Sequence, residues 1–151
     1  MKTKRETFIY EGLGFPVELI DCPMKEVVGE WVLDINIMAL QRFVFRGLIH
    51  KPTPLTGKEM RFMRKFLGLS TVDLGKKLGV SHAAVVKWEK EDSKISPSQE
   101  AYARLIFCKL FQGSELEKLF TEVTAELLAK EANSETSTIK VPARDLAAAN
   151  F

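Results

Sequence analysis

The pattern of apolar and polar residues divides the chain into an extended part and a helical part. Residues 8–35 combine glycines with alternating apolar side chains, which is typical of strands. We predict two strands there, joined by a turn, with Asp21-Cys22-Pro23 interrupting regular structure. The side chains of Phe15, Trp31 and Leu33 are expected to form the core of this small β-rich module.

From Asn36 onward, apolar residues recur every three or four positions, which predicts α-helices. Asn36 can cap a helix over 37–48, and Thr56 and Glu59 fit a capping box at the start of a later helix. Between them, Lys51-Pro52-Thr53-Pro54 is predicted to be a stiff linker, because proline disfavours helix at the residue before it. Beyond this linker, helices are predicted at residues 57–67, 71–78, 82–90, 97–111 and 114–130.

The predicted fold class is therefore mainly α, in three parts. Residues 1–50 form a small β-rich N-terminal module with a helix, and residues 51–131 form a helical domain. Residues 132–151 are rich in serine, threonine and alanine, and we expect a loosely ordered tail that docks through Ile139 and Val141.

Two of the predicted helices are separated by only three residues, Gly79-Val80-Ser81. Gly79 can adopt the positive φ that ends one helix, and Ser81 can cap the next. Gly75 is expected where the two helices cross closely, because it has no side chain. The helices share the apolar residues Leu74, Leu78, Val80, Val85 and Trp88, and the second helix is left with Ser81, His82, Ala83, Val86 and Lys87 exposed.

Positive charge is concentrated in the centre of the chain. The net charge is +2 overall, but residues 51–112 carry 12 basic and 6 acidic side chains, while residues 1–50 and 113–151 are mildly acidic. A basic centre suggests contact with a polyanion when it coincides with a nucleic-acid-binding scaffold. Charge alone is weak evidence, since runs of charge are usually solvated surfaces.

Residues 56–111 resemble a known nucleic-acid-binding scaffold. Leu69-Ser70, Leu74-Gly75, Leu78-Gly79-Val80-Ser81 and Trp88-Glu89 occur at the spacing of the XRE (Cro/C1-type) helix-turn-helix family, which residues 56–111 resemble. The resemblance implies a five-helix XRE-type DNA-binding domain that regulates transcription. It also implies a structural ion pair between Arg64 and Glu89, although Arg64 could instead be a solvated surface residue.

The same resemblance implies the DNA contacts. Ser70, Thr71 and Ser81 occupy the positions that hold phosphates through hydroxyls and helix N-termini. His82, Ala83 and Lys87 occupy the base-reading positions, where Lys87 can donate to guanine and Ala83 can touch a thymine methyl group. His82 could equally be an ordinary exposed histidine, whereas Trp88 is interpreted as core. Further phosphate contacts are open to Lys58, Lys76, Lys77 and Lys90.

Residues 10–36 resemble more faintly the segment that precedes the helix-turn-helix in MqsA/YgiT-type antitoxins, where a small β-rich domain binds the toxin and cysteine pairs hold zinc. This chain has no Cys-x-x-Cys, and Cys22 alone cannot build a four-ligand site, so we expect no metal and no other cofactor. The alternative for this module is a dimerisation or ligand-binding domain.

Other classes of protein are less compatible with the sequence. No apolar run is long enough to span a membrane and the N-terminus lacks a signal-peptide pattern, so we expect a cytoplasmic protein. No nucleophile–base spacing or phosphate loop is present, so we expect no enzyme.

Two functional hypotheses remain. One is an antitoxin-type autorepressor of a toxin-antitoxin operon that binds a cognate toxin protein. The other is a stand-alone XRE-family transcriptional regulator whose N-terminal module dimerises or senses a ligand. Either would act as a homodimer on double-stranded DNA, at an inverted repeat with half-sites about 34 Å apart or a multiple of that. The helix at 114–130 could form the dimer contact or could be internal core.

Overall fold

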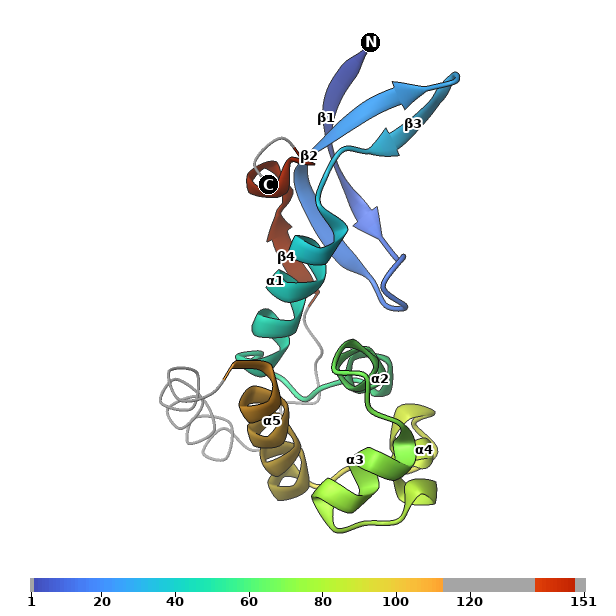
Figure 1. The fold of residues 1–151 in the computed structure, drawn as a ribbon, viewed down its shortest axis with the longest axis vertical. Helices are drawn as coiled ribbons and strands as arrows, with labels where there is room; N and C mark the ends of the chain where they lie inside the picture. Colours follow the sequence, from blue (N-terminus) through green and yellow to red (C-terminus); the bar gives the residue numbers. More distant parts are fainter. Residues whose placement is uncertain (1, 113–137, 149–151) are drawn as a thin grey trace. The chain divides into compact units, whose positions relative to one another are not determined.

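Four β-strands and five α-helices make up residues 2–112 and 138–148, the residues that the computed structural model describes (Figure 1). In chain order they are β1 (Thr3–Tyr10), β2 (Val17–Val27), β3 (Glu30–Leu33), α1 (Ile37–Ile49), α2 (Gly57–Phe66), α3 (Thr71–Leu78), α4 (His82–Glu89), α5 (Pro97–Gln112), β4 (Ile139–Pro142) and the 3₁₀ helix η1 (Ala143–Leu146). The chain divides into two compact units. Unit 1 comprises Met1–Gly47 with Thr138–Phe151, and unit 2 comprises Leu48–Ser137. The predicted helix at 114–130 lies outside the described residues.

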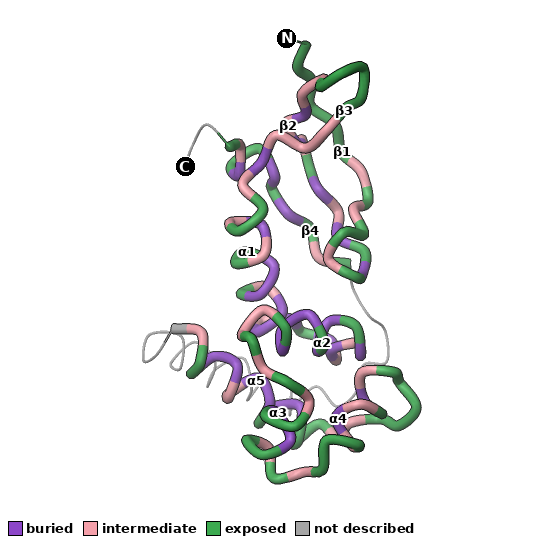
Figure 2. Tube along the Cα trace, turned by 45° about the vertical axis from the view of Figure 1, so that its right-hand side comes forward, coloured by how far each residue is buried: buried purple, intermediate pink, exposed green. Residues whose placement is uncertain are grey.

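Strand β2 is the centre of the sheet in unit 1. β1 pairs antiparallel with it along one side, while β4 pairs parallel with Val17–Ile20 and β3 pairs antiparallel with Met24–Val27 on the other side. One face of β2 forms the core of the unit through Val17, Leu19, Cys22 and Met24, which are all buried (Figure 2). The predicted β-rich N-terminal module is therefore present.

The predicted interruption at Asp21-Cys22-Pro23 is wrong, because β2 runs through these residues. The pairing with β1 changes register between Glu6 and Phe8, so that Thr7 faces two residues of β2. Asp21 accommodates the extra residue with a φ of +53°, and its N–H donates to Oγ1 of Thr7 at 2.9 Å. The local signal thus marks a β-bulge within the strand.

The predicted core of this module is only partly present. Phe15 is buried and Leu33 is half-buried, but Trp31 is 39% exposed. Trp31 lies on β3 near the two-residue turn Val28-Gly29, where both φ angles are positive, as a tight hairpin turn requires. The Lys4 ammonium lies over its ring, 4.5 Å from the ring centre, in a cation–π contact.

The prediction of a loosely ordered tail is wrong for residues 138–148. Residues 139–142 form β4, in which Val141 is fully buried and Ile139 is half-buried, so the expected docking residues are those of a strand. The segment then returns to the start of α1. The N–H of Asn36 donates to the carbonyl of Leu146, and the N–H of Ala148 donates to the carbonyl of Asp34. Residues 132–137 lie outside the described residues.

The helices of unit 2 begin where the sequence predicts. The Thr56 hydroxyl accepts from the N–H of Glu59, whose carboxylate accepts from the N–H of Thr56, which completes the predicted capping box. In unit 1, the Asn36 side chain likewise accepts from the N–H of Ala39 at the start of α1. These caps satisfy backbone donors that a helix start leaves without partners.

The predicted linker Lys51-Pro52-Thr53-Pro54 is held against unit 2 through the buried residues Lys51 and Thr53, and the division between the two units falls three residues earlier, between Gly47 and Leu48. Arg104 of α5 is fully buried and donates to the carbonyls of Leu48, Ile49, Lys51 and Thr53, at 2.6–3.3 Å, and to the carboxylate of Glu100 at 2.6 Å. The Lys51 ammonium donates to Glu59 at 2.7 Å. Buried charged groups need such partners, and here they hold the segment in place.

Candidate nucleic-acid interface

Helices α3 and α4 are joined by a tight turn whose backbone follows from its sequence. Gly79 has a φ of +72° and a ψ of +30°, the left-handed conformation that ends α3, and the N–H of Val80 donates to the carbonyl of Gly75. The Ser81 hydroxyl then accepts from the N–H of Ala84 at 3.1 Å and starts α4. The turn between the two helices is therefore fixed at both ends by local chemistry.

Gly75 permits the close crossing that the sequence predicts. A Cβ atom added at this glycine would lie 2.7 Å from the carbonyl oxygen of Val80 and 3.3 Å from the backbone nitrogen of His82. Both neighbours are backbone atoms, which cannot rotate away. Any side chain at residue 75 would therefore push α3 away from the turn and from the start of α4.

Arg64 and Glu89 form the ion pair that the resemblance implies. Nε of Arg64 donates to Oε2 of Glu89 at 2.7 Å and Nη2 donates to Oε1 at 2.9 Å, while Nη1 donates to the carbonyl of Leu69. The two side chains are only 10% and 8% exposed. This two-pronged contact ties the end of α4 to α2 and to the residue before the Ser70 cap.

A second contact between α2 and α4 was not anticipated from the sequence. A Cβ added at Gly57 would lie 2.3 Å from the carbonyl oxygen of Glu89, so the start of α2 touches the end of α4. The N–H of Gly57 also donates to the carboxylate of Glu91. The signal that could have revealed this contact is a glycine directly after a helix cap, where no turn requires one.

The inner side of α4 is apolar. Leu74 and Val85 are fully buried and Trp88 is 8% exposed, so Trp88 is a core residue, as predicted. Leu78 and Val80 are only half-buried. Because Trp88 and Glu89 are both held on the inner side, the rotation of α4 about its axis is fixed.

The outer side of α4 carries most of the predicted DNA-contacting residues. Ser81, His82, Ala83 and Lys87 are all exposed, whereas Val86 is half-buried. Ala83 and Lys87 are four positions apart and lie one above the other, and His82 lies about 100° around the helix axis from Ala83, so the three residues fall within about 140° of the helix circumference. The structure thus brings the three predicted base-reading residues together on one exposed helical surface.

The start of α3 is less open than predicted. Ser70 is exposed and Thr71 is half-buried, but the N–H of Ser70 already donates to the carboxylate of Asp73, and the Ser70 hydroxyl accepts from the N–H of Asp73. These hydrogen bonds hold the pKa of Asp73 below its ordinary value, with a smaller contribution from Lys76 and Lys77. A phosphate at the start of α3 would therefore contact the hydroxyl groups of Ser70 and Thr71 and the ammonium groups of Lys76 and Lys77. It would lie beside the ionised carboxylate of Asp73.

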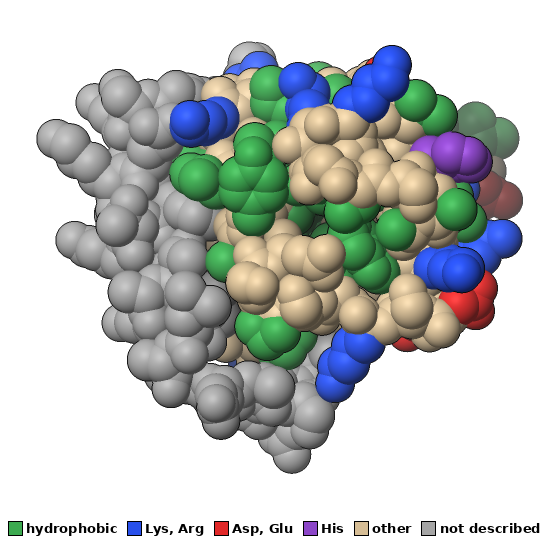
Figure 3. Space-filling model, turned by 90° about the horizontal axis from the view of Figure 1, so that it is seen from below, with side chains coloured by type: hydrophobic (Ala, Val, Ile, Leu, Met, Phe, Trp, Pro, Cys, Tyr) green, Lys and Arg blue, Asp and Glu red, His purple; other side chains and the backbone are tan. Residues whose placement is uncertain are grey.

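The excess positive charge of residues 51–112 lies on the protein surface. Three ion pairs, Lys51–Glu59, Arg64–Glu89 and Arg104–Glu100, bury equal numbers of basic and acidic groups. The excess basic charge of residues 51–112 is therefore carried by exposed side chains, including Lys76 and Lys77 on α3. Figure 3 views the molecule from below, onto the end of unit 2 that carries α3 and α4. It shows lysine and arginine side chains spread around this end, with apolar side chains between them.

The described residues show no sign of a metal site or a membrane span. No group of three or more histidine, cysteine, aspartate or glutamate side chains in residues 2–112 and 138–148 could hold a metal ion. Within the same residues, no helix is both long enough and apolar enough to cross a bilayer. Cys22 and Cys108 are both buried thiols, and burial, helped by Glu6, raises the pKa of the Cys22 thiol to about 11.

A comparison with curated proteins finds a relative in Sulfurisphaera tokodaii that is named "Putative HTH-type transcriptional regulatory protein". The two sequences are 29% identical over 97 residues, which cover 56% of this chain and 32% of the relative. The chain thus matches about a third of the relative's length. No family model and no solved structure matches this chain.

Proposed function

We propose that this protein is a sequence-specific DNA-binding transcriptional regulator in which α3 and α4 form a helix-turn-helix motif of the XRE type. In this proposal α4 enters the major groove, and His82, Ala83 and Lys87 read base edges. Ser70, Thr71 and Ser81, with Lys76 and Lys77, contact phosphates. The proposal includes no catalytic step.

The observation that carries this proposal is the fixed orientation of α4. Its inner residues, Trp88 and Glu89, are held in the interior, so His82 and Lys87 face outward on a short, capped helix. Two further observations support it: the excess positive charge of residues 51–112 is exposed, and the Sulfurisphaera tokodaii relative is named for an HTH-type regulatory role. A DNA-binding surface needs both the outward-facing helix and the positive field.

A homodimer on an inverted repeat is part of the proposal, because one such motif contacts too few base pairs for useful specificity. The expected half-sites lie about 34 Å apart, or a multiple of that distance. We further propose that the protein represses transcription when its operator lies within a promoter.

The experiment that tests DNA binding is selection of bound duplexes from a random pool by the full-length protein. Enrichment of an inverted repeat supports the proposal. Recovery of sequences without any shared motif, at low salt, means that the protein does not read bases.

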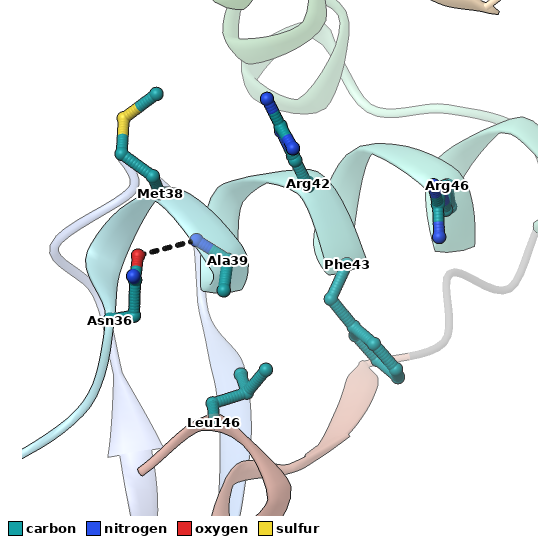
Figure 4. A pocket seen from close by; sticks show the side chains of 7 residues that line it. All are labelled: Asn36, Met38, Ala39, Arg42, Phe43, Arg46 and Leu146. Atoms are coloured by element: carbon teal, nitrogen blue, oxygen red, sulfur yellow. Dashed lines mark hydrogen bonds between the residues drawn. The ribbon is translucent and has the colours of Figure 1, made fainter. Parts of the chain in front are cut away.

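For the biological role, we retain two candidates. An antitoxin-type autorepressor is favoured by the order of a small β-rich module followed by the helical unit. A stand-alone regulator that senses a ligand is favoured by a hollow of about 310 Å³ beside α1 in unit 1 (Figure 4). The described residues that line it are Asn36, Met38, Ala39, Arg42, Phe43, Arg46 and Leu146. Co-purification with the product of the neighbouring gene separates them: a tight complex with a small nuclease-like protein supports the antitoxin, and its absence supports the stand-alone regulator.

A further inference from the structure

The turn that ends α4 places a glutamate where a glycine is usual. The N–H of Glu91 donates to the carbonyl of Trp88 at 3.1 Å, and the N–H of Asp92 donates to the carbonyl of Lys87 at 2.9 Å. This pair of hydrogen bonds is the Schellman motif, in which the residue after the helix cap adopts the left-handed conformation. Glu91 does so with a φ of +62°, which costs free energy for a residue that has a side chain. The turn by itself would therefore favour glycine at this position.

The side chain of Glu91 forms a contact that glycine could not form. Its Oε1 accepts a hydrogen bond from the N–H of Gly57 at 2.9 Å. Gly57 is the first residue of α2, so this N–H has no hydrogen-bond partner within its own helix. The positive end of the α2 dipole also favours a carboxylate there. The contact with α2 thus offsets the strain of the turn, and strain that is kept in this way points to a functional role.

Glu91 is the second attachment of the α4 end to α2. The first is the ion pair between Arg64 and Glu89. Arg64 lies seven residues beyond Gly57, which is about 10 Å along α2 at a rise of about 1.5 Å per residue. A single attachment would leave the end of α4 free to pivot about it. Two attachments at separate points along α2 fix the direction of α4 as well as its position.

We propose that Glu91 is a positioning residue for DNA recognition, and this inference rests on the proposed function. Glu91 acts through α4: it prevents the helix from pivoting about the Arg64–Glu89 contact. The base-reading side chains of α4 need this restraint, because a hydrogen bond to a base edge tolerates little change in distance or angle. Attraction to phosphates depends less on orientation. Loss of the Glu91 carboxylate should therefore reduce discrimination between DNA sequences more than it reduces affinity for DNA in general.

The test uses the full-length protein and two duplexes, the one enriched from the random pool and a scrambled duplex of the same composition. Discrimination is the ratio of the two Kd values. Glu91→Gly removes the carboxylate and relieves the backbone, whereas Glu91→Ala removes the carboxylate only. Glu91→Gln keeps an oxygen that can accept from Gly57. Asp92→Ala is the matched control, because it removes the same charge from the next exposed residue.

We expect discrimination to fall about tenfold in Glu91→Gly and Glu91→Ala, which is equivalent to the loss of roughly one base contact. Glu91→Gln and Asp92→Ala should keep the wild-type ratio. The melting temperature should fall in Glu91→Ala but not in Glu91→Gly, because glycine adopts the left-handed conformation freely. Lower discrimination at an unchanged melting temperature distinguishes positioning from general destabilisation. Amide hydrogen exchange at Gly57 should be about tenfold faster in the two variants that lack an acceptor.

Four results would overturn the inference. Unchanged exchange at Gly57 in Glu91→Gly would show that the contact does not form. Wild-type discrimination in Glu91→Gly would show that the contact is structural only. An equal loss in Asp92→Ala would assign the effect to charge, and an equal loss in Glu91→Gln would show that the hydrogen bond to Gly57 is not the link. Failure of the wild-type protein to enrich any motif is a separate result, seen before any variant is compared, and it overturns the proposed function together with this inference.

Discussion

Arg64 binds both carboxylate oxygens of Glu89, at 2.7 and 2.9 Å, in a nearly buried contact between α2 and the last residue of α4. The same guanidinium donates to the carbonyl of Leu69, just before the cap of α3. One side chain therefore fixes both helices of the α3–α4 pair to α2. The outward orientation of His82 and Lys87 depends on this contact, because it holds the C-terminal end of α4 against α2.

Replacing Arg64 by alanine should lower the free energy of unfolding by about 3–5 kcal/mol, since it leaves the Glu89 carboxylate nearly buried without its partner. Urea unfolding measures the change. Arg61→Ala is the matched control, because Arg61 is an exposed arginine of the same helix, and a change within about 0.5 kcal/mol is expected. Equal effects of the two substitutions would mean that the ion pair contributes nothing specific.

Gly75→Ala should destabilise the protein, although glycine to alanine normally stabilises a helix by about 0.5–1 kcal/mol. The added Cβ would lie 2.7 Å from the carbonyl oxygen of Val80, and we expect a loss of about 1–3 kcal/mol from this crowding. Gly47→Ala in α1 is the control, because its Cβ would meet only the Ile139 side chain, at 3.9 Å. It should leave stability unchanged or raise it. Stabilisation by Gly75→Ala would show that the helices do not cross as closely as described.

His50 should make the stability of unit 2 sensitive to pH. Burial, and secondly the charge of Arg104, hold the pKa of His50 below its ordinary value of 6.5. The unfolded chain therefore binds a proton at His50 before the folded protein does. The free energy of unfolding should fall as the pH drops below about 6.5, until the lower folded pKa is passed. Urea unfolding at a series of pH values measures this, and His50→Gln should reduce the slope in that window. An unchanged slope would mean that other groups cause the pH dependence.

Lys76 and Lys77 should contribute to DNA affinity without contributing to sequence preference. Each phosphate contact that is lost reduces the magnitude of the slope of log K against log salt concentration by about 1. The double variant Lys76→Ala/Lys77→Ala should therefore show a slope smaller by about 2, with equal losses on specific and unrelated duplexes. Lys2→Ala, an exposed lysine of unit 1, serves as the control and should leave the slope unchanged.

Local chemistry explains which parts of the fold the sequence could predict. The caps at Asn36, Thr56, Ser70 and Ser81 and the left-handed Gly79 depend on neighbouring residues only, and all are present. The burial of Trp88 and the crowding at Gly75 follow from helical spacing within a short segment. These features also determine the outer surface of α4.

Features that depend on distant partners were missed. Asp21 and Pro23 look like strand breakers locally, yet β2 continues through both: Asp21 lies in the bulge opposite Thr7, and Pro23 pairs in register with Arg5 of β1. Residues 139–142 form a strand only because the edge of β2 is available to them. The segment around Lys51 resembles a linker because the residue that buries it, Arg104, lies more than 50 positions away. The hollow on α1 likewise requires Leu146, which no pattern near residue 39 could indicate.

The most direct test of base reading by α4 is the affinity of the Lys87→Ala variant for a selected operator and for a scrambled duplex of the same length and composition. The account predicts a loss of about 1–3 kcal/mol per half-site on the operator, relaxed preference at one base pair of each half-site, and a much smaller loss on the scrambled duplex. An equal loss on both duplexes, or failure of the wild-type protein to bind either one at low salt, would contradict it.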